Sequence, residues 1–196
     1  MNPVRFLGDA LRTATKSVAF LWRTQGAERQ QLISDLQKIC SRCEDAYVAV
    51  LSALSVVKNA YGDQPKLVSA LRSFASNSET RVAFKPEHLC GEVDQILQRL
   101  ASKVDWLKYS VDLREIERLR GAIANMGSYD GQLWDYYDDH TRAMDELATA
   151  LQSPLKGQEL EERLSYAKHV VDDFEDDLRA TLKEIRAAKE RVVSLM

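Results

Sequence analysis

The chain of 196 residues contains few of the residues that interrupt helices, with eight glycines and four prolines. No window alternates apolar and polar residues as a half-buried β-strand does. Apolar residues make up 45% of the chain and charged residues 29%, which is typical of a globular protein and not of a disordered one. The sequence therefore predicts an all-α protein, and its length suffices for a single domain, residues 1–196, with a substantial core.

A hydrophobic run long enough to cross a membrane is also missing. The longest apolar run, residues 46–57, has no charged residue, but a membrane-spanning helix needs about 20 apolar residues. Charged residues such as Arg42, Asp45 and Lys58 flank the run closely. The run therefore predicts the middle of a core helix, which we place at residues 27–61. Because it is apolar on most sides, we expect it to be buried on most sides.

Apolar residues recur at spacings of three and four in every predicted helix, which is the seam of a helix that packs lengthwise on another. The predicted helices are an N-terminal amphipathic helix at 4–23, a short helix at 65–75, and long helices at 27–61, 86–126, 129–152 and 158–195. The seam of residues 27–61 consists of Ile33, Leu36, Cys40, Cys43, Tyr47, Val50, Leu54, Val57 and Tyr61. A change of phase predicts a kink or the start of a new helix near residues 109–112. Together these patterns predict an elongated bundle of about six to seven helices with a coiled-coil-like core of four long helices.

Two segments predict breaks between the early helices. Gly62 is expected to cap the end of the helix at 27–61, and Pro65 prevents that helix from continuing. Residues 76–85 show no periodicity and predict a loop, which Val82 and Phe84 are expected to anchor to the core.

Most catalytic motifs are absent. There is no Gly-rich phosphate loop, no Ser-His-Asp arrangement and no Glu-x-x-His motif of the kind found in di-metal bundles. Cys40 and Cys43 form a C-x-x-C pair, but both occupy seam positions in the middle of a helix, where we expect them to be small buried hydrophobic residues. The odd number of three cysteines and the absence of a secretory signal fit a reducing compartment, so we expect a cytoplasmic protein.

Residues 129–140 are the segment richest in chemically active side chains, with four aspartates, three tyrosines, a tryptophan and a histidine. The segment suits a polar pocket or a metal site in the bundle. The alternative is that Tyr137 and His140 face the core, while Asp135, Asp138 and Asp139 face water. We favour this alternative and therefore predict no metal, cofactor or catalytic residue.

Charge is distributed unevenly, although the net charge is only −3. Residues 1–27 carry four basic residues against one acidic residue, and residues 128–177 carry fourteen acidic residues against four basic ones. The acidic total argues against nucleic-acid binding. The basic N-terminal helix predicts either packing on the acidic half of the protein or contact with a membrane or partner. The residues expected to make that contact are Arg5, Phe6, Arg12, Lys16 and Trp22.

The densest acidic segment is expected to be a solvated face or a docking surface for a basic partner. It consists of Asp172, Asp173, Glu175, Asp176 and Asp177. Because like charges this close together destabilise a helix, we expect a basic neighbour.

These observations predict a non-enzymatic, intracellular interaction or scaffold protein that binds a protein partner or forms a homo-oligomer. One alternative is a helical bundle that binds membranes through residues 4–23. A third hypothesis is a metal- or cofactor-binding bundle centred on His140.

Overall fold

The computed structural model describes residues 12, 27–83, 95, 98, 132–153 and 156–194. Their helices are α2 (Ala27–Asn59), α3 (Gln64–Ala75), α4 (Ser78–Ala83), α8 (Gln132–Gln152) and α9 (Gln158–Val193), with no strand in this part of the chain. The predicted all-α fold is therefore confirmed. The predicted helix at 86–126 and the kink near 109–112 lie outside the described residues, and so does nearly all of the helix at 4–23.

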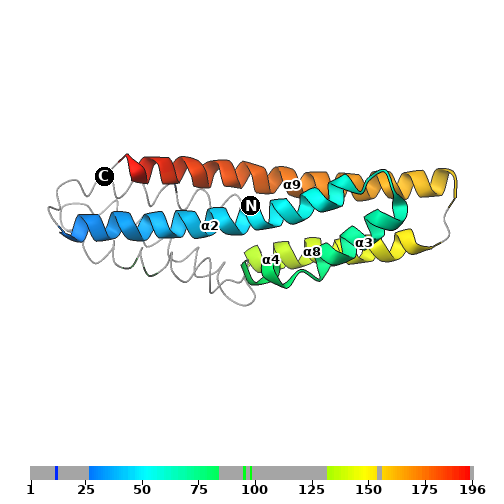
Figure 1. Ribbon diagram of the computed structural model, residues 1–196, viewed down its shortest axis with the longest axis horizontal. Coiled ribbons are helices and arrows are strands. Elements are labelled where there is room, and N and C mark those ends of the chain that lie inside the picture. The colour runs from blue at the N-terminus through cyan, green and yellow to red at the C-terminus, as the bar shows by residue number, and fades with distance from the viewer. Residues whose placement is uncertain are drawn as a thin grey trace.

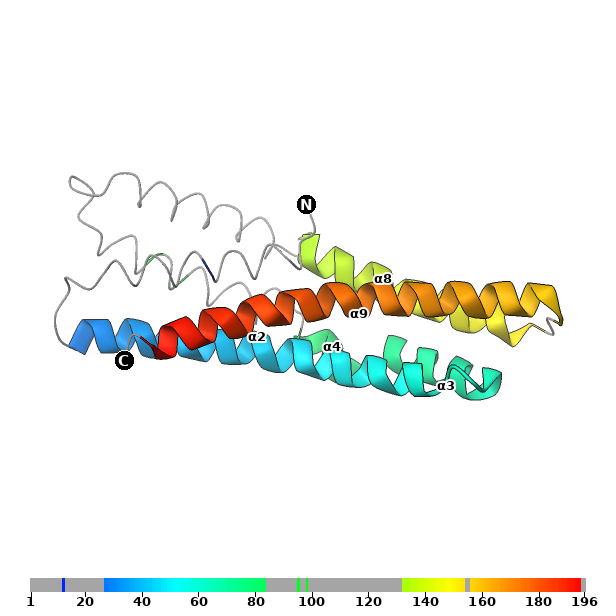
Figure 2. The same cartoon turned by 90° about the horizontal axis from the view of Figure 1, so that it is seen from above.

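The described helices form an elongated bundle (Figure 1). Helices α2 and α9 run antiparallel and lie side by side in both views (Figures 1 and 2). At 1.5 Å per residue, the 36 residues of α9 extend over about 54 Å. Helices α3 and α8 pack against each other, α3 also packs on α2, and α8 packs on α9. This part of the molecule is therefore a four-helix bundle of α2, α3, α8 and α9.

The predicted seams form the core. All eight seam residues of α2 from Ile33 to Val57 are buried, and in α9 the seam is buried from Ala167 to Val192. Phe74 of α3 meets Phe174 of α9 edge to face, with ring centroids 6.4 Å apart, an arrangement that aromatic pairs favour. The heptad spacing therefore located the buried face of each described long helix correctly.

The expectation that α2 is buried on most sides is wrong. Val48 and Val56 are 42% and 58% exposed, and Ser52, Ser55 and Asn59 are also exposed. Helix α2 packs on α9 and α3, and its third side faces solvent. We call these five residues the outer face of α2.

The predicted loop at 76–85 contains a short helix, α4. Its N-terminus is capped by Asn77, whose Oδ1 accepts hydrogen bonds from the backbone N–H groups of Glu79 and Thr80 at 3.0 and 3.2 Å. Val82 does not anchor the segment, because it is 46% exposed, whereas Thr80 is buried. The six residues are too few to display an apolar period, so capping chemistry determines the helix. Phe84 lies outside the described residues.

The break after α2 also differs from the expectation. Gly62 does not adopt a positive φ, and the glycine that does so in the described part of the chain is Gly157, at φ 59°. Asp63 instead begins α3 by accepting the backbone N–H of Lys66 at 3.1 Å, with Pro65 in the first turn. Proline is favoured there because its missing N–H would have no helical partner.

Candidate functional site

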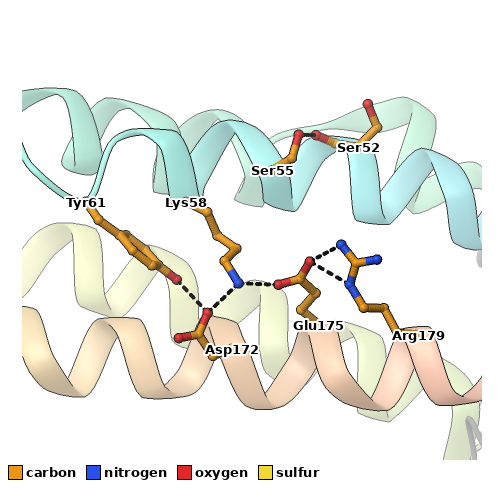
Figure 3. Close-up of polar contacts among 7 residues, drawn as sticks. All are labelled: Ser52, Ser55, Lys58, Tyr61, Asp172, Glu175 and Arg179. Atoms are coloured by element: carbon orange, nitrogen blue, oxygen red, sulfur yellow. Dashed lines mark hydrogen bonds and ion pairs between the residues drawn. The ribbon is translucent and has the colours of Figure 1, made fainter.

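A network of charged side chains joins the end of α2 to the middle of α9 (Figure 3). The Lys58 Nζ lies 2.8 Å from Asp172 Oδ1 and also donates a short hydrogen bond to Glu175 Oε2. The Arg179 Nε donates to the other carboxylate oxygen of Glu175 at 2.8 Å. The Tyr61 hydroxyl donates to Asp172 Oδ1 at 3.3 Å. Glu175 is only 5% exposed, so a buried carboxylate lies between two cations.

The pKa shifts of Glu175, Lys58 and Tyr61 keep these three groups in their usual charge states. Burial raises the pKa of Glu175, but hydrogen bonds from Lys58 and Arg179 outweigh burial and lower the pKa overall. Hydrogen bonds to Asp172 and Glu175 raise the pKa of Lys58. Burial, followed by the charge of Asp172, raises the pKa of the Tyr61 phenol. A general acid or base needs a pKa near the working pH. The three shifts instead move the pKa of each group further from neutral pH. The network therefore suits helix pairing and not proton transfer.

A second ion-pair cluster joins the same two helices two heptads away. The Glu44 carboxylate accepts hydrogen bonds from Arg186 Nε at 2.8 Å and from Lys189 Nζ at 2.7 Å. These two hydrogen bonds lower the pKa of Glu44. Glu44 lies fourteen residues before Lys58, and Lys189 lies fourteen residues after Glu175. Because the two spacings are equal, both clusters form with the same alignment of α2 and α9. They lie beside the apolar seam, as ion pairs do in coiled coils.

The five acidic residues of the predicted docking surface do not share one exposed face of α9. Asp173 and Asp176 face solvent, and Asp173 lies 3.2 Å from His169 Nε2. Glu175 is buried and paired, so it cannot serve as part of an exposed docking surface, and its inclusion is a wrong prediction. Asp172 is bound by Lys58, and Asp177 accepts a hydrogen bond from the Tyr136 hydroxyl at 2.8 Å. The expected basic neighbour is Lys58 of α2.

His140 packs within the bundle. Its Nδ1 lies 2.7 Å from the backbone oxygen of Tyr136, and its ring stacks on Phe174 with a centroid distance of 4.2 Å. Among the residues with described surroundings, no group of three or more His, Cys, Asp or Glu side chains could hold a metal ion. Tyr137 is fully buried, and its hydroxyl donates to Thr80 at 2.7 Å. These contacts of the His140 ring agree with the prediction that His140 faces the core.

The aspartates of that segment differ in their environments. Asp135 and Asp139 are exposed as expected, but Asp138 is half-buried. Its two carboxylate oxygens accept hydrogen bonds from Arg81 of α4 and Arg142 of α8, each at 3.1 Å. Asp138 therefore connects α4 to α8 instead of facing only water.

Cys40 and Cys43 are free and buried, which confirms the prediction that they are packing residues. Burial raises the pKa of the Cys40 thiol to about 11. A redox or catalytic cysteine reacts as its thiolate. At neutral pH the Cys40 thiol stays protonated and therefore unreactive.

An open groove of about 550 Å³ lies between α8 and the segment formed by the end of α3 and α4. Three arginines line it, namely Arg72 from α3, Arg81 from α4 and Arg142 from α8. These residues are far apart in the sequence, and sequence analysis did not single them out. No local motif unites them, so only the pairing of α3 with α8 reveals the groove.

The N-terminal residues expected to contact a membrane or partner lie outside the described part of the chain, except for Arg12. The Arg12 Nη1 lies 3.7 Å from Glu184 Oε2 of α9. Arg12 therefore lies close to α9. Of the helices searched within the described residues, none is long and apolar enough to cross a membrane.

Comparisons with known proteins give no relative. No family model matches the chain, and neither the curated proteins nor the solved structures contain a match.

Proposed function

We propose that this protein is a non-enzymatic interaction protein whose bundle self-associates through the outer face of α2. Its buried free thiols, Cys40 and Cys43, support a reducing compartment, and we place it in the cytoplasm. The observation that supports self-association is an exposed face of α2 that carries no charged side chain.

The outer face of α2 differs from an ordinary solvated helix surface. Residues 46–57 contain no charged side chain, yet this stretch exposes Val48, Ser52, Ser55 and Val56. The solvent-facing side of α9 instead carries exposed charges throughout its length, including Glu161, Lys168, Asp176, Lys183 and Arg191. A helix surface depleted in charge and containing valine is suited to contact with another protein surface.

The arrangement of the outer face favours a second copy of the same chain. Val48 and Val56 lie four residues before and after Ser52, and two small residues, Ala49 and Ser55, lie three residues before and after it. Two α2 helices that meet antiparallel about a twofold axis at Ser52 would therefore place each Val48 against the partner's Val56. Such self-complementary contacts are the basis of the commonest oligomers.

The same pairing avoids repulsion between like charges. Asp45 lies seven residues before Ser52, and Asn59 lies seven residues after it. In the antiparallel pair, each Asp45 would meet the amide of the partner's Asn59. The contact involves little more than one helix from each copy, so its area falls at the small end of specific interfaces. We therefore expect a weak, reversible dimer.

Disulfide trapping tests this geometry. In a Ser52→Cys variant, the two thiols would lie next to the twofold axis and should form an intermolecular disulfide under mild oxidation. In a Val48→Cys variant, the two thiols would be eight residues apart along the helix pair, or about 12 Å, which is beyond disulfide reach. The wild-type chain, oxidised in parallel, controls for its own cysteines.

We expect a covalent dimer from Ser52→Cys and none from Val48→Cys. If both variants crosslink equally, the helices pair in parallel and the antiparallel dimer is wrong. If neither variant exceeds the wild type at any protein concentration, the outer face does not self-associate.

A further inference from the structure

Helix α9 changes from acidic to basic at Thr181. The thirteen residues before it, 168–180, include two basic and five acidic residues, which gives a formal net charge of −3. The thirteen residues after it, 182–194, include four basic and two acidic residues, which gives a net charge of +2. The ion pairs with Lys58 and Glu44 of α2 offset one charge in each half. The acidic half, 168–180, and the basic half, 182–194, therefore keep net charges of opposite sign.

The middle of the outer face of α2 lies level with this change of charge. Lys58 of α2 pairs with Glu175 of α9, and the two helices run antiparallel. Ser52 lies six residues before Lys58, and Thr181 lies six residues after Glu175. The ion pairs of Glu44 give the same alignment. Ser52, the centre of the proposed α2 contact, is therefore level with Thr181.

A twofold axis at Ser52 would relate the α9 helices of the two copies as well as the α2 helices. Because α9 lies beside α2 (Figures 1 and 2), rotation about this axis leaves both α9 helices on the same side of the α2 pair. The two α9 helices would run antiparallel to each other and be centred on Thr181. The acidic half of each α9 would then lie opposite the basic half of the partner's α9, whereas a parallel pair would place like charges together.

Asp176 and Lys183 are exposed residues that this arrangement suits. They lie seven residues apart and therefore share one face of α9, and neither forms an ion pair with another described residue. Arg179, one turn from each, bonds to Glu175 (Figure 3), so this face borders α2. Each Asp176 would lie level with the partner's Arg186 and one turn from the partner's Lys183. Lys183 would lie level with the partner's Arg179, whose charge is already offset by Glu175.

We propose that the acidic half of α9 faces the basic half of the partner's α9, so that the partner of this acidic surface is a second copy of the chain. This inference rests on the proposed self-association through α2 and extends that interface to α9. Complementary charges of this kind steer two surfaces together and fix their orientation. Because the charges are exposed to solvent, their effect should weaken as salt is added.

Reversing one charge at a time tests this pairing by sedimentation equilibrium at low salt. Asp176→Lys and Lys183→Glu should each weaken the homodimer about fivefold, because symmetry places two repulsive pairs in each dimer. An equimolar mixture of the two variants should recover about the wild-type affinity. In the mixed dimer, both lysines of one copy face both carboxylates of the other, so the two contacts are attractive again. Recovery on mixing also shows that the variants are folded.

Glu161→Lys is the matched control, because it changes the net charge as much as Asp176→Lys does. Glu161 lies twenty residues before Thr181, so its counterpart position is beyond the end of the partner's α9. We expect its dimer affinity to equal that of the wild type. If the wild type dimerises but the two variants dimerise as strongly as it does, or mixing restores nothing, the α9 pairing is wrong and association through α2 stands. A wild-type chain that stays monomeric at every concentration overturns both proposals.

Discussion

Glu175 has a different environment from the exposed acidic residues next to it in the sequence. In the sequence it is one of five acids around Phe174, but in the bundle it is buried between Lys58 and Arg179. A buried carboxylate without partners destabilises a protein strongly. With two cationic partners it instead joins α2 to α9, while Asp173 on the same helix remains in solvent.

Neutralising Glu175 should therefore cost stability, whereas neutralising its exposed neighbour should not. We expect Glu175→Gln to lower the free energy of unfolding by about 1–2 kcal/mol, because two charge-assisted hydrogen bonds are weakened. Asp173→Asn, the matched control, should change it by less than about 0.5 kcal/mol. Urea denaturation followed by circular dichroism measures both, and equal effects would contradict the assigned role of Glu175.

The pKa shifts predict how stability depends on pH. The folded-state pKa of Glu175 lies below its ordinary value of 4.5, so its stabilising contribution is present above pH 4.5 and is lost as the pH falls through the folded-state pKa. The pKa of Lys58 is raised above 10.5, so its contribution is present below pH 10.5 and is lost as the pH rises through the folded-state pKa.

Urea denaturation at a series of pH values tests these signs. The stability difference between wild type and Glu175→Gln should be constant near neutral pH and should shrink as the pH falls below 4.5. A difference that grows in acid would contradict the direction assigned to Glu175.

Two buried threonines allow the same substitution to be compared in different settings. The Thr80 hydroxyl accepts from Tyr137 and donates to the Asn77 backbone oxygen at 3.1 Å. The Thr181 hydroxyl is buried without a hydrogen-bond partner. We expect Thr181→Val to be neutral or to stabilise by up to about 1 kcal/mol, and Thr80→Val to destabilise by about 1–2 kcal/mol. Thermal unfolding of the two variants would show opposite or clearly unequal shifts, and equal losses would contradict these assignments.

At the scale of helices, the pairing of α2 with α9 combines an apolar seam and two ion-pair clusters. The seam is set by the heptad spacing, and the clusters around Glu44 and Lys58 fix which turn of α9 each turn of α2 meets. Because like charges would meet if the helices slid past each other, the clusters favour one register.

The start of α9 depends on a glycine. Gly157 has φ 59° and ψ −134° at the N-cap position, a conformation that side chains with a Cβ atom adopt only with strain. We expect Gly157→Ala to destabilise the protein by about 1–3 kcal/mol. Gly62, which lacks a positive φ and has open space around its Cα, is the control, and Gly62→Ala should be neutral or slightly stabilising. Chemical denaturation that ranked Gly62→Ala as the more harmful change would contradict this account of the turn.

Much of the helix arrangement was predictable, because the heptad spacing is a local property of the sequence. The seam from Ile33 to Val57 is buried as predicted, and α8 and α9 begin within three residues of their predicted positions. The outer face of α2 was mispredicted, because an apolar composition does not say how many neighbours a helix has. The partners of Lys58 and the arginine groove depend on contacts between residues distant in the sequence, which no spacing rule specifies.

At the scale of the whole molecule, one surface of the described residues is proposed for binding another protein. The outer face of α2 is uncharged and suits a second copy of the chain. The charged network of Lys58, Asp172 and Glu175 lies within the bundle, where it holds α2 against α9.

Sedimentation equilibrium over a range of protein concentrations tests self-association through α2 most directly. We expect the wild-type chain to shift reversibly from monomer towards dimer as the concentration rises. We expect Val56→Lys, which places a charge in the outer face of α2 without touching the core, to remain monomeric over the same range. A wild-type chain that is monomeric at every concentration, or a Val56→Lys variant that dimerises as strongly as the wild type, would contradict the proposed function.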